Sequence, residues 1–585
     1  MRDPAGLSNF VERVYDPASP VYHQFLTATE LAARFGPTER DYEAVKNFAL
    51  GNGLAVSATH GNRMLLDVIG PASAVEKAFQ VTLRTYRHPT EGRDFFAPDT
   101  EPLVGAALPL ADIQGLSDYS RPHPRCRQSA GAAAKPQSGS APNGSGEFFG
   151  TDFRNAYAPG VTLTGQGQTV GLAEFDGFYA SDISTYAAQA GSGRGNIPVH
   201  TVLLDGYDGT PGSGNFEVSL DIEMAMSMAP GLSRIVSFEA GPYGQPNDVL
   251  NSMLSYSGTI KQLSSSWGWA WGPSVTTDNI FQSMEAAGQS FFNAAGDSDA
   301  FTTGANSENG VDNLSLDNAP SSSPYITQAG ATTLSMSGTG ASYASERVWN
   351  WGYDNGSFIG TSGGISSYYA IPSWQSGISM AANGGSASFR NIPDVALTGD
   401  NVYVGYGDGT GGGFGGTSCA APLWAGFMAL VNQQAIAAGR PAAGFINPAI
   451  YSIAAGAAYT NCFHDITTGN NAWGGSLGLY YAKAGYDLCT GLGTPAGQNL
   501  INVLAGSSAI QGIVREAGFT ASGVFNCTWS VVAGLRYQVH YKTNLLQANW
   551  MNLGSPVPAT NTSLAVSDAN AVNSPQRFYR LIVSP

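Results

Sequence analysis

The sequence has few cysteines, few charged residues and no long apolar run, and each shortage excludes a class of protein. Five cysteines in 585 residues are too few for a disulfide scaffold, and none forms a Cys-x-x-Cys metal pair. Charged residues make up only 12% and the net charge is -16, so no basic surface suited to nucleic acid is expected. No run of about 18 apolar residues occurs, so no membrane span is predicted.

The composition and the N-terminus also indicate where the protein works. The first ten residues, MRDPAGLSNF, lack the apolar core of a signal peptide, so we expect a secreted protein whose export signal is not part of this chain. A low content of charges suits a protein that meets acid, because few ion pairs are lost when carboxylates protonate. Cys462 and Cys489 are the best candidates for a disulfide, with two buried free thiols as the open alternative. We expect a monomer.

The chain is too long for one hydrophobic core and divides into four segments. Residues 1–120 alternate helical and strand patterns and predict an α+β domain. Residues 121–150 are rich in Pro, Ser, Ala and Gly and predict a flexible linker open to cleavage. Residues 151–506 alternate strands such as QTVGLAEF and NVYVGYG with helices such as SLDIEMAMSMA, which predicts an α/β fold with a doubly wound parallel sheet. Residues 507–585 predict a small β-sandwich.

The motif with the clearest chemical content is GGTSCAAP, residues 415–422, which opens the apolar stretch LWAGFMALV. Ser418 therefore stands at a Gly-rich entry to a buried helix, where free backbone N–H groups can stabilise an oxyanion. An ordinary helix N-cap serine is the alternative, but the Ala-Ala-Pro continuation favours a nucleophile. No histidine occupies the Gly-flanked setting of a Ser-His-Asp triad, which argues against an ordinary subtilisin.

A pair of acids offers a replacement for the missing histidine. Glu217 and Asp221 are four residues apart, so on a helix both carboxyl groups share one face. Val218, Leu220 and Ile222 give this segment an apolar background. Two carboxyl groups on one buried face are expected to share a proton. The alternative is two solvated acids on a surface helix, so the hypothesis requires burial.

These motifs together resemble the sedolisin family of serine-carboxyl peptidases, and its kumamolisin-like members in particular. The family's Ser-Gly-Thr-Ser nucleophile motif is matched except that Gly415 replaces the first Ser. Its Glu-x-x-x-Asp helix matches Glu217 and Asp221, and its Ala-Gly-Asp-Ser motif matches at Asp297. The resemblance implies a subtilisin-like catalytic domain and an endopeptidase that acts on proteins and peptides.

The resemblance also implies a role for each of these side chains. Ser418 would attack the scissile carbonyl, Glu217 would accept its proton and return it to the leaving amine, and Asp221 would orient Glu217. Asp297 would donate a hydrogen bond to the oxyanion, for which it must be protonated. The predicted optimum is therefore acidic, at about pH 3–5. An inactive surface-binding protein on the same scaffold remains the competing hypothesis.

Residues around this set carry further implications of the resemblance. Glu174 and Trp267 match positions that extend the proton network, with ordinary structural roles as the alternative. Residues 1–120 match a propeptide with a shortened start, which implies a folding aid and inhibitor of the chain's own peptidase domain. Cleavage in the linker, residues 121–150, would remove it, and self-cleavage near residues 140–150 on acidification would support this reading.

Two loops near the end of the central segment suggest a metal site. Carboxylates with backbone carbonyls on tight turns offer hard oxygen ligands, which suit Ca²⁺ better than Zn²⁺. The resemblance implies one structural Ca²⁺ here, and Asp-rich turns without metal are the alternative. The implied ligands are the side chains of Asp465 and Asp487 and the main-chain carbonyls of Ile466, Lys483 and Gly485.

Overall fold

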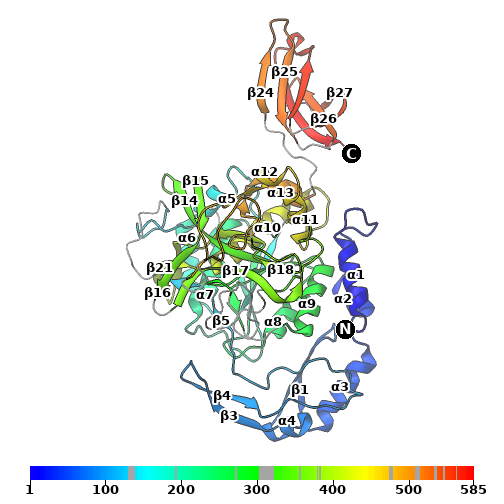
Figure 1. The fold of residues 1–585 in the computed structure, drawn as a ribbon, viewed down its shortest axis with the longest axis vertical. Helices are drawn as coiled ribbons and strands as arrows, with labels where there is room; N and C mark the ends of the chain where they lie inside the picture. Colours follow the sequence, from blue (N-terminus) through cyan, green and yellow to red (C-terminus); the bar gives the residue numbers. More distant parts are fainter. Residues whose placement is uncertain are drawn as a thin grey trace.

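A computed structural model of the protein describes most of the chain (Figure 1). Within the described residues, no helix is both long enough and apolar enough to cross a lipid bilayer. The description covers residues 1–129, 139–191, 194–269, 273–301, 320, 322–354, 357–378, 380, 384–473, 478–506, 514–531, 536–544, 547, 549–560 and 563–584.

An extended sheet forms the centre of the protein. In the described part of the chain its strand order is β15-β14-β12-β10-β7-β9-β8, and β19 also pairs with β14. Every pairing is parallel except that of β14 with β15 at one edge. The strands are β7 (Thr169–Glu174), β8 (Val199–Leu203), β9 (Arg234–Glu239), β10 (Gln262–Ser265), β12 (Ser290–Ala294), β14 (Thr327–Ser337), β15 (Ser342–Val348) and β19 (Val395–Thr398).

Helices cover both faces of this sheet, as the contacts of two successive side chains on β12 show. Phe292 stacks on Trp424 of one helix, with 5.9 Å between ring centroids, whereas the adjacent Phe291 meets Phe281 of another helix at 5.1 Å. Successive strand residues point to opposite faces, so these helices lie on opposite sides. The predicted doubly wound α/β fold is confirmed. The helices of this unit are α5 (Asp152–Tyr157), α6 (Ala180–Ala190), α7 (Asn215–Met228), α8 (Pro246–Ser255), α9 (Val275–Ala286), α10 (Thr417–Ala437), α11 (Asn447–Ala454), α12 (Tyr459–Cys462) and α13 (Gln498–Leu504).

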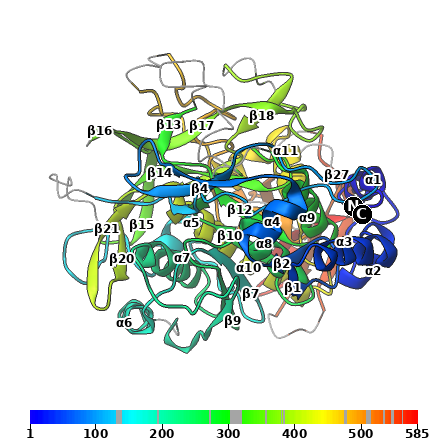
Figure 2. The same cartoon turned by 90° about the horizontal axis from the view of Figure 1, so that it is seen from below.

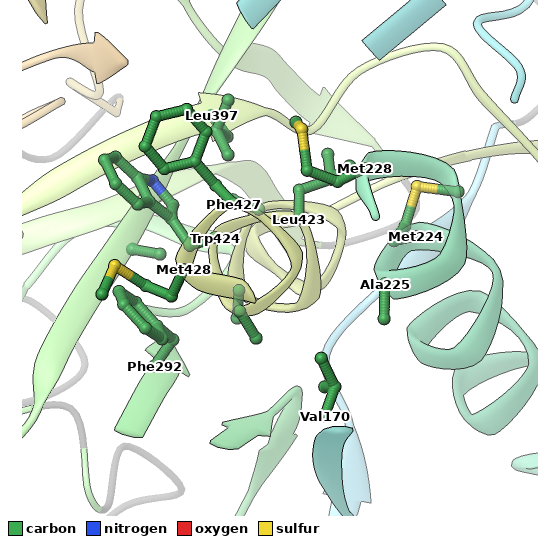
Figure 3. Close-up of a cluster of buried hydrophobic side chains, with 14 of the residues drawn as sticks. Val170, Met224, Ala225, Met228, Phe292, Leu397, Leu423, Trp424, Phe427 and Met428 are labelled. Atoms are coloured by element: carbon green, nitrogen blue, oxygen red, sulfur yellow. The ribbon is translucent and has the colours of Figure 1, made fainter. Parts of the chain in front are cut away.

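Helix α10 lies inside the protein, packed against α7 and the sheet (Figure 3). Every residue from Thr417 to Asn432 is buried. The two helices approach closely at Gly426, where a Cβ atom would lie 2.8 Å from Met228 Cβ. At the other end of α7, Glu217 lies beside Ser418, so the N-terminal ends of the two helices carry the candidate site.

The N-terminal α+β unit packs on the central unit through α1 (Figure 2). Tyr15 Oη donates to the Glu285 carbonyl at 2.8 Å and accepts from Phe445 N at 2.8 Å. Leu7 and Phe10 share an apolar cluster with Phe445. The elements of this unit are α1 (Pro4–Val14), α2 (Ala28–Arg34), α3 (Glu39–Gly51), α4 (Ala72–Phe79), β1 (Ala55–Thr59), β2 (Leu66–Ile69), β3 (Leu83–Arg87) and β4 (Asp94–Pro98).

The C-terminal strands form a β-sandwich with its own core, at one end of the molecule in Figure 1. Strands β24-β25-β28 form one antiparallel sheet and β27-β26-β29 the other. Trp529 and Tyr537 are buried between them. The strands are β24 (Val514–Phe519), β25 (Phe525–Ser530), β26 (Arg536–Lys542), β27 (Met551–Pro558), β28 (Ser563–Asp568) and β29 (Phe578–Ser584).

One predicted strand of the central unit lies outside its main sheet. The run NVYVGYG forms β20 (Val402–Tyr406), which pairs antiparallel with β21 (Thr410–Gly415). The turn between them contains Gly407, Asp408 and Gly409, all with positive φ, and this chemistry favours a hairpin over a helical crossover. The other strands of this unit in the described part of the chain are β11 (Trp267–Gly268), β13 (Ser298–Ala300), β16 (Asn350–Asp354), β17 (Ser357–Ala370), β18 (Phe389–Ile392), β22 (Phe463–His464) and β23 (Thr494–Pro495).

The disulfide considered between Cys462 and Cys489 is absent. All five cysteines are buried free thiols. Cys489 Sγ lies 3.5 Å from Asn471 Oδ1 and 3.4 Å from the Tyr480 carbonyl oxygen, so its thiol is directed at these groups. The alternative of two buried free thiols therefore holds.

Packing around α10 should dominate the stability of the central unit. Phe427 is fully buried and packs on Trp424 at 5.5 Å, so we expect Phe427→Ala to lower the free energy of unfolding by about 3–5 kcal/mol. Ile436→Ala, on the same helix but 53% exposed, should change it by only about 0.5 kcal/mol. Urea denaturation at neutral pH measures both, and equal losses would contradict the packing described.

Candidate active site

Helix α7 carries Glu217 and Asp221 one turn apart, and both side chains are fully buried. Ser266 Oγ lies 2.5 Å from Asp221 Oδ1 and 3.1 Å from the carbonyl oxygen of Ser418. This hydroxyl therefore links the acidic face of α7 to the start of α10. The carboxyl pair points into the protein interior, as the sequence hypothesis required.

Asp297 is fixed at the start of α10 beside Ser418. Its Oδ1 accepts hydrogen bonds from Thr417 N at 2.8 Å and Thr417 Oγ1 at 2.7 Å. Among the described residues its Oδ2 has no hydrogen-bond partner, and it lies 2.7 Å from where a Cβ atom of Gly416 would be. Glycine at 416 therefore leaves open the space that this carboxyl oxygen faces.

Glu174 and Trp267 extend the acidic cluster away from Ser418. Trp267 Nε1 donates to Glu174 Oε2 at 2.7 Å, and both side chains are buried. Glu174 and Asp221 lie close enough for each to affect the pKa of the other. The structure thus brings together Glu174, Asp221 and Glu217 in a row that ends at Ser418.

Burial shifts the titration of every carboxyl group in this cluster. It raises the pKa of Glu217 to about 7, against the lowering effect of the Ser418 hydroxyl and of Cys126. Burial, together with the charge of Glu217, raises the pKa of Asp221 well above its ordinary value. Burial and the charge of Asp221 do the same for Glu174. The row therefore holds protons at pH values where exposed carboxyl groups have lost them.

The pKa of Asp297 is set by a different combination of effects. Burial raises its pKa to about 6, while the hydrogen bonds from Thr417 and the positive charges of Arg125 and Arg127 lower it. Below that value Asp297 carries a proton that it can donate. Its unpartnered Oδ2 is the oxygen available for such a donation.

The chain that follows the N-terminal unit crosses this site. Cys126 N donates to Glu217 Oε2 at 2.9 Å, and Arg125 and Cys126 are both buried. Residues flanking them form β5 (His123–Pro124), paired with β11, and β6 (Arg127–Gln128), paired with β21. The composition of residues 121–150 predicts a flexible linker here instead. The difference arises because a strand can be held by main-chain hydrogen bonds that no side-chain pattern records.

The sequence does not single out Ser266 and Thr417, whose hydroxyl groups position the carboxyl groups. Both lie next to residues that it did single out, Trp267 and Ser418. A serine or threonine inside a motif is a common local hydrogen-bonding residue, so only the three-dimensional contact distinguishes these two. In the described residues, the groups found around Ser418 are carboxyl groups and include no histidine. His464, for example, stacks on Tyr343 instead.

The loops expected to bind calcium lie together. Asp465 Oδ2 accepts from Gly485 N at 2.9 Å, and Asp487 Oδ2 accepts from Lys483 N at 3.0 Å. Ile466 and Asp487 are buried, and burial raises the pKa of Asp487 to about 7. This arrangement fits a divalent cation, because a bound positive charge would offset the burial of Asp487 and the partial burial of Asp465.

Similarity to known proteins identifies the class of protein to which the chain belongs. Residues 1–118 match the family described as pro-kumamolisin, activation domain. Kumamolisin from Bacillus sp. (strain MN-32) is 32% identical over 82% of this chain and 85% of its own length. Sedolisin from Pseudomonas sp. (strain 101) is 28% identical over 84% of each chain. The solved structure of Pseudomonas sedolisin, a serine-carboxyl proteinase with two bound molecules of pseudo-iodotyrostatin, matches with a TM-score of 0.52 and 25% identity over 61% of this chain and 98% of that chain.

These features define a serine peptidase made with an N-terminal propeptide. The chain belongs to the sedolisin family of serine-carboxyl peptidases, and its N-terminal unit is a propeptide of the kumamolisin type. The prediction of an α/β catalytic domain built on a parallel sheet is confirmed by the match to the sedolisin structure and by the sheet itself.

The buried carboxyl groups should make the protein less stable as the pH rises. Since the pKa of Glu217 is raised to about 7, the folded chain keeps a proton that the unfolded chain loses near pH ~4.3. This contribution is complete below about pH 4 and is lost as the pH rises toward 7. In a Ser418→Ala background that keeps the chain intact, the melting temperature should fall between about pH 4.5 and about pH 7.5.

Glu217→Gln in that background should weaken this pH dependence, because the amide cannot ionise. Glu43→Gln is the matched control, since that side chain is 54% exposed on α3 and should leave the dependence unchanged. Scanning calorimetry across the pH range measures all three proteins. An unaltered slope in the Glu217→Gln protein would show that this carboxyl group is not held protonated by the fold.

Proposed function

We propose that this protein is a secreted, acid-active serine-carboxyl endopeptidase made as a zymogen that processes itself. The observation that carries the proposal is the burial of Glu217, Asp221 and Asp297 around the start of the helix that bears Ser418. A set of carboxyl groups that retains protons toward neutral pH can exchange them with a substrate in acid.

The proposed reaction follows from the row of carboxyl groups. Ser418 Oγ attacks the scissile carbonyl carbon while Glu217 accepts the hydroxyl proton, and Glu217 then gives this proton to the leaving nitrogen. Asp221 stands behind Glu217 and fixes its position and charge. Glu174, held by Trp267, does the same for Asp221. Water releases the acyl group by the reverse sequence of proton transfers.

Asp297 supplies the second requirement for acid. Charge develops on the scissile carbonyl oxygen during attack, and a hydrogen-bond donor must face it. Asp297 Oδ2 is free to donate only when the carboxyl group is protonated, which burial favours below about pH 6. The reaction also needs the ionised form of Glu217, which is the minor form at that pH because burial raises the pKa of this group to about 7; the Ser418 hydroxyl and the Cys126 N–H both stabilise the ionised form.

Digestion of casein from about pH 2 to about pH 8 tests this proposal. The wild-type chain should be active in acid, and Ser418→Ala should reduce kcat at least about 10³-fold because the nucleophile is lost. Ser255→Ala, at an exposed position on α8, should leave activity unchanged. Equal activity of the Ser418→Ala and wild-type proteins, with both folded by circular dichroism, would remove Ser418 from the mechanism. Inactivity of a folded wild-type chain at every pH would favour the surface-binding alternative.

We further propose that one Ca²⁺ binds at the loops that contain Asp465 and Asp487, with carbonyls of Ile466, Lys483 and Gly485. The adjacent acidic side chains and the oxygen-only donor set support it. The ion would supply only structural stability.

Removal of the metal should therefore destabilise the fold. A stoichiometric excess of EDTA should lower the melting temperature at neutral pH, and added CaCl₂ should restore it. Asp487→Asn should abolish the response to CaCl₂, whereas Asp208→Asn, at an exposed turn, should retain it. Identical melting curves with EDTA and with CaCl₂ would exclude a calcium site that contributes to stability.

A further inference from the structure

Asp176 lies outside the row of carboxyl groups that the proposed reaction uses, although it follows Glu174 by only two residues. It is 6% exposed. Three main-chain N–H groups donate to it: Gly177 N and Gly212 N lie 2.7 and 2.6 Å from Oδ1, and Gly214 N lies 2.6 Å from Oδ2. A carboxylate is an acceptor only, so this side chain can accept from all three donors at once. Asp176 therefore fixes the end of the loop that leads into α7.

The earlier part of the same loop is also anchored on the end of β7. Tyr207 Oη lies 3.1 Å from Asp176 Oδ1 and also contacts the carbonyl oxygen of Thr210. A Cβ atom at Gly177 would collide with the carbonyl oxygen of Gly209. The loop from residue 207 to residue 214 is therefore packed directly on residues 176 and 177.

Gly214 connects the Asp176 carboxyl group to Glu217. It is the residue before the first turn of α7, and it has no side chain with which to cap the helix. Its carbonyl oxygen accepts a hydrogen bond from Glu217 N at 2.9 Å. A negatively charged group beside the first N–H groups of a helix stabilises that end. Asp176 thus determines where Gly214 lies, and Gly214 determines where the first turn of α7 begins.

Gly214 also contacts the other end of the row. A Cβ atom at this position would lie 2.9 Å from Trp267 Cη2 and 3.0 Å from Asp176 Oδ2. The φ of Gly214 is -93°, so these contacts, rather than the backbone conformation, require glycine. Trp267 donates its indole N–H to Glu174, and Phe175 packs edge-to-face on its ring with 5.7 Å between the centroids. Gly214 is therefore held closely between the carboxyl group and the indole ring.

We propose that Asp176 is a positioning residue for the peptidase reaction. It holds Gly214 between its own carboxyl group and Trp267. Glu217 at one end of the row and Glu174 at the other are thereby kept in place relative to the nucleophile. This inference rests on the proposed peptidase mechanism. Because Asp176 acts through these groups, its loss should lower the rate of the chemical step and leave substrate binding unchanged.

Asp176→Asn tests the inference in the full chain, held in acid until its processing is complete and assayed with labelled casein at about pH 4. The amide must turn its NH₂ group toward at least one of the three N–H donors, which loosens the loop. We expect kcat to fall roughly 10- to 100-fold with KM within about twofold of the wild-type value, because a small misplacement of catalytic groups is enough for such a loss.

Asp182→Asn is the matched control. Asp182 is 3% exposed and accepts from Asp408 N at 2.9 Å and from Gly409 N at 2.6 Å, but these bonds hold the turn between β20 and β21. This variant should lose comparable stability in thermal melting and keep the wild-type kcat. An equal fall of kcat in both variants would overturn the inference, because any loosened buried carboxyl group would then have the same effect.

Gly214→Ala tests the same path from its other side. The added methyl group should push the main chain away from Asp176 and Trp267 and lower kcat by a similar factor. If the two substitutions act through one contact, the double variant Asp176→Asn/Gly214→Ala should lose no more than about the larger single loss, whereas two unrelated defects would multiply. Gly214→Ala alone carries the test if Asp176→Asn does not fold.

The outcomes separate this inference from the peptidase proposal. A wild-type kcat in either folded single variant, or losses that multiply in the double variant, would overturn the positioning role and leave the peptidase proposal standing, since the wild type still digests casein. A folded wild-type chain that digests no casein at any pH would refute the peptidase proposal itself, and the positioning role with it. Circular dichroism checks that each chain is folded.

Discussion

Removal of several carboxyl groups from water around one hydroxyl group is the constraint on which the rest of the structure depends. A carboxylate in a poorly hydrated interior is costly, so each group keeps its proton to a higher pH than it would in solvent. Glu174, Asp221 and Glu217 also oppose one another's ionisation, since each sits near the charge of the next. The same burial that destabilises the protein toward neutral pH provides the protons for the proposed chemistry.

The fold provides this burial by placing two apolar helices in close contact. Helix α10 is surrounded by α7 and by the sheet, and Gly426 allows its backbone to approach Met228 without a side chain between them. Because Ser418 and Glu217 both lie at the N-terminal ends of these helices, the packing of the two helices determines how the hydroxyl and carboxyl groups meet. Ser266 adds a polar link across the same contact.

Much of this arrangement could be predicted from residue patterns, and the remainder could not for definable reasons. The spacing of Glu217 and Asp221 indicates one face of a helix, and the Gly-Thr-Ser-Cys-Ala-Ala-Pro motif indicates the start of a helix. Both could be predicted because they depend only on neighbouring residues. The strands β5 and β6 depend on hydrogen bonds of the main chain with β11 and β21, which side-chain composition does not encode. Whether Cys462 and Cys489 meet likewise depends on the path of the chain between them. Asp465 and Asp487 were recognisable only as acids on turns.

Groups of the linker change the protonation of groups in the site. Arg125 and Arg127 oppose the protonation of Asp297, whereas Cys126 N–H favours the ionised form of Glu217. With the linker in place, the two arginines therefore work against protonation of Asp297, the proposed oxyanion donor. The Cys126 N–H supports Glu217 as the proposed base. Near neutral pH Asp297, whose pKa is about 6, is ionised and cannot serve as the oxyanion donor, whereas acid protonates both groups, Glu217 first because its pKa is about 7. A chain segment that occupies its own site can therefore remain intact near neutral pH and still lie in position for attack.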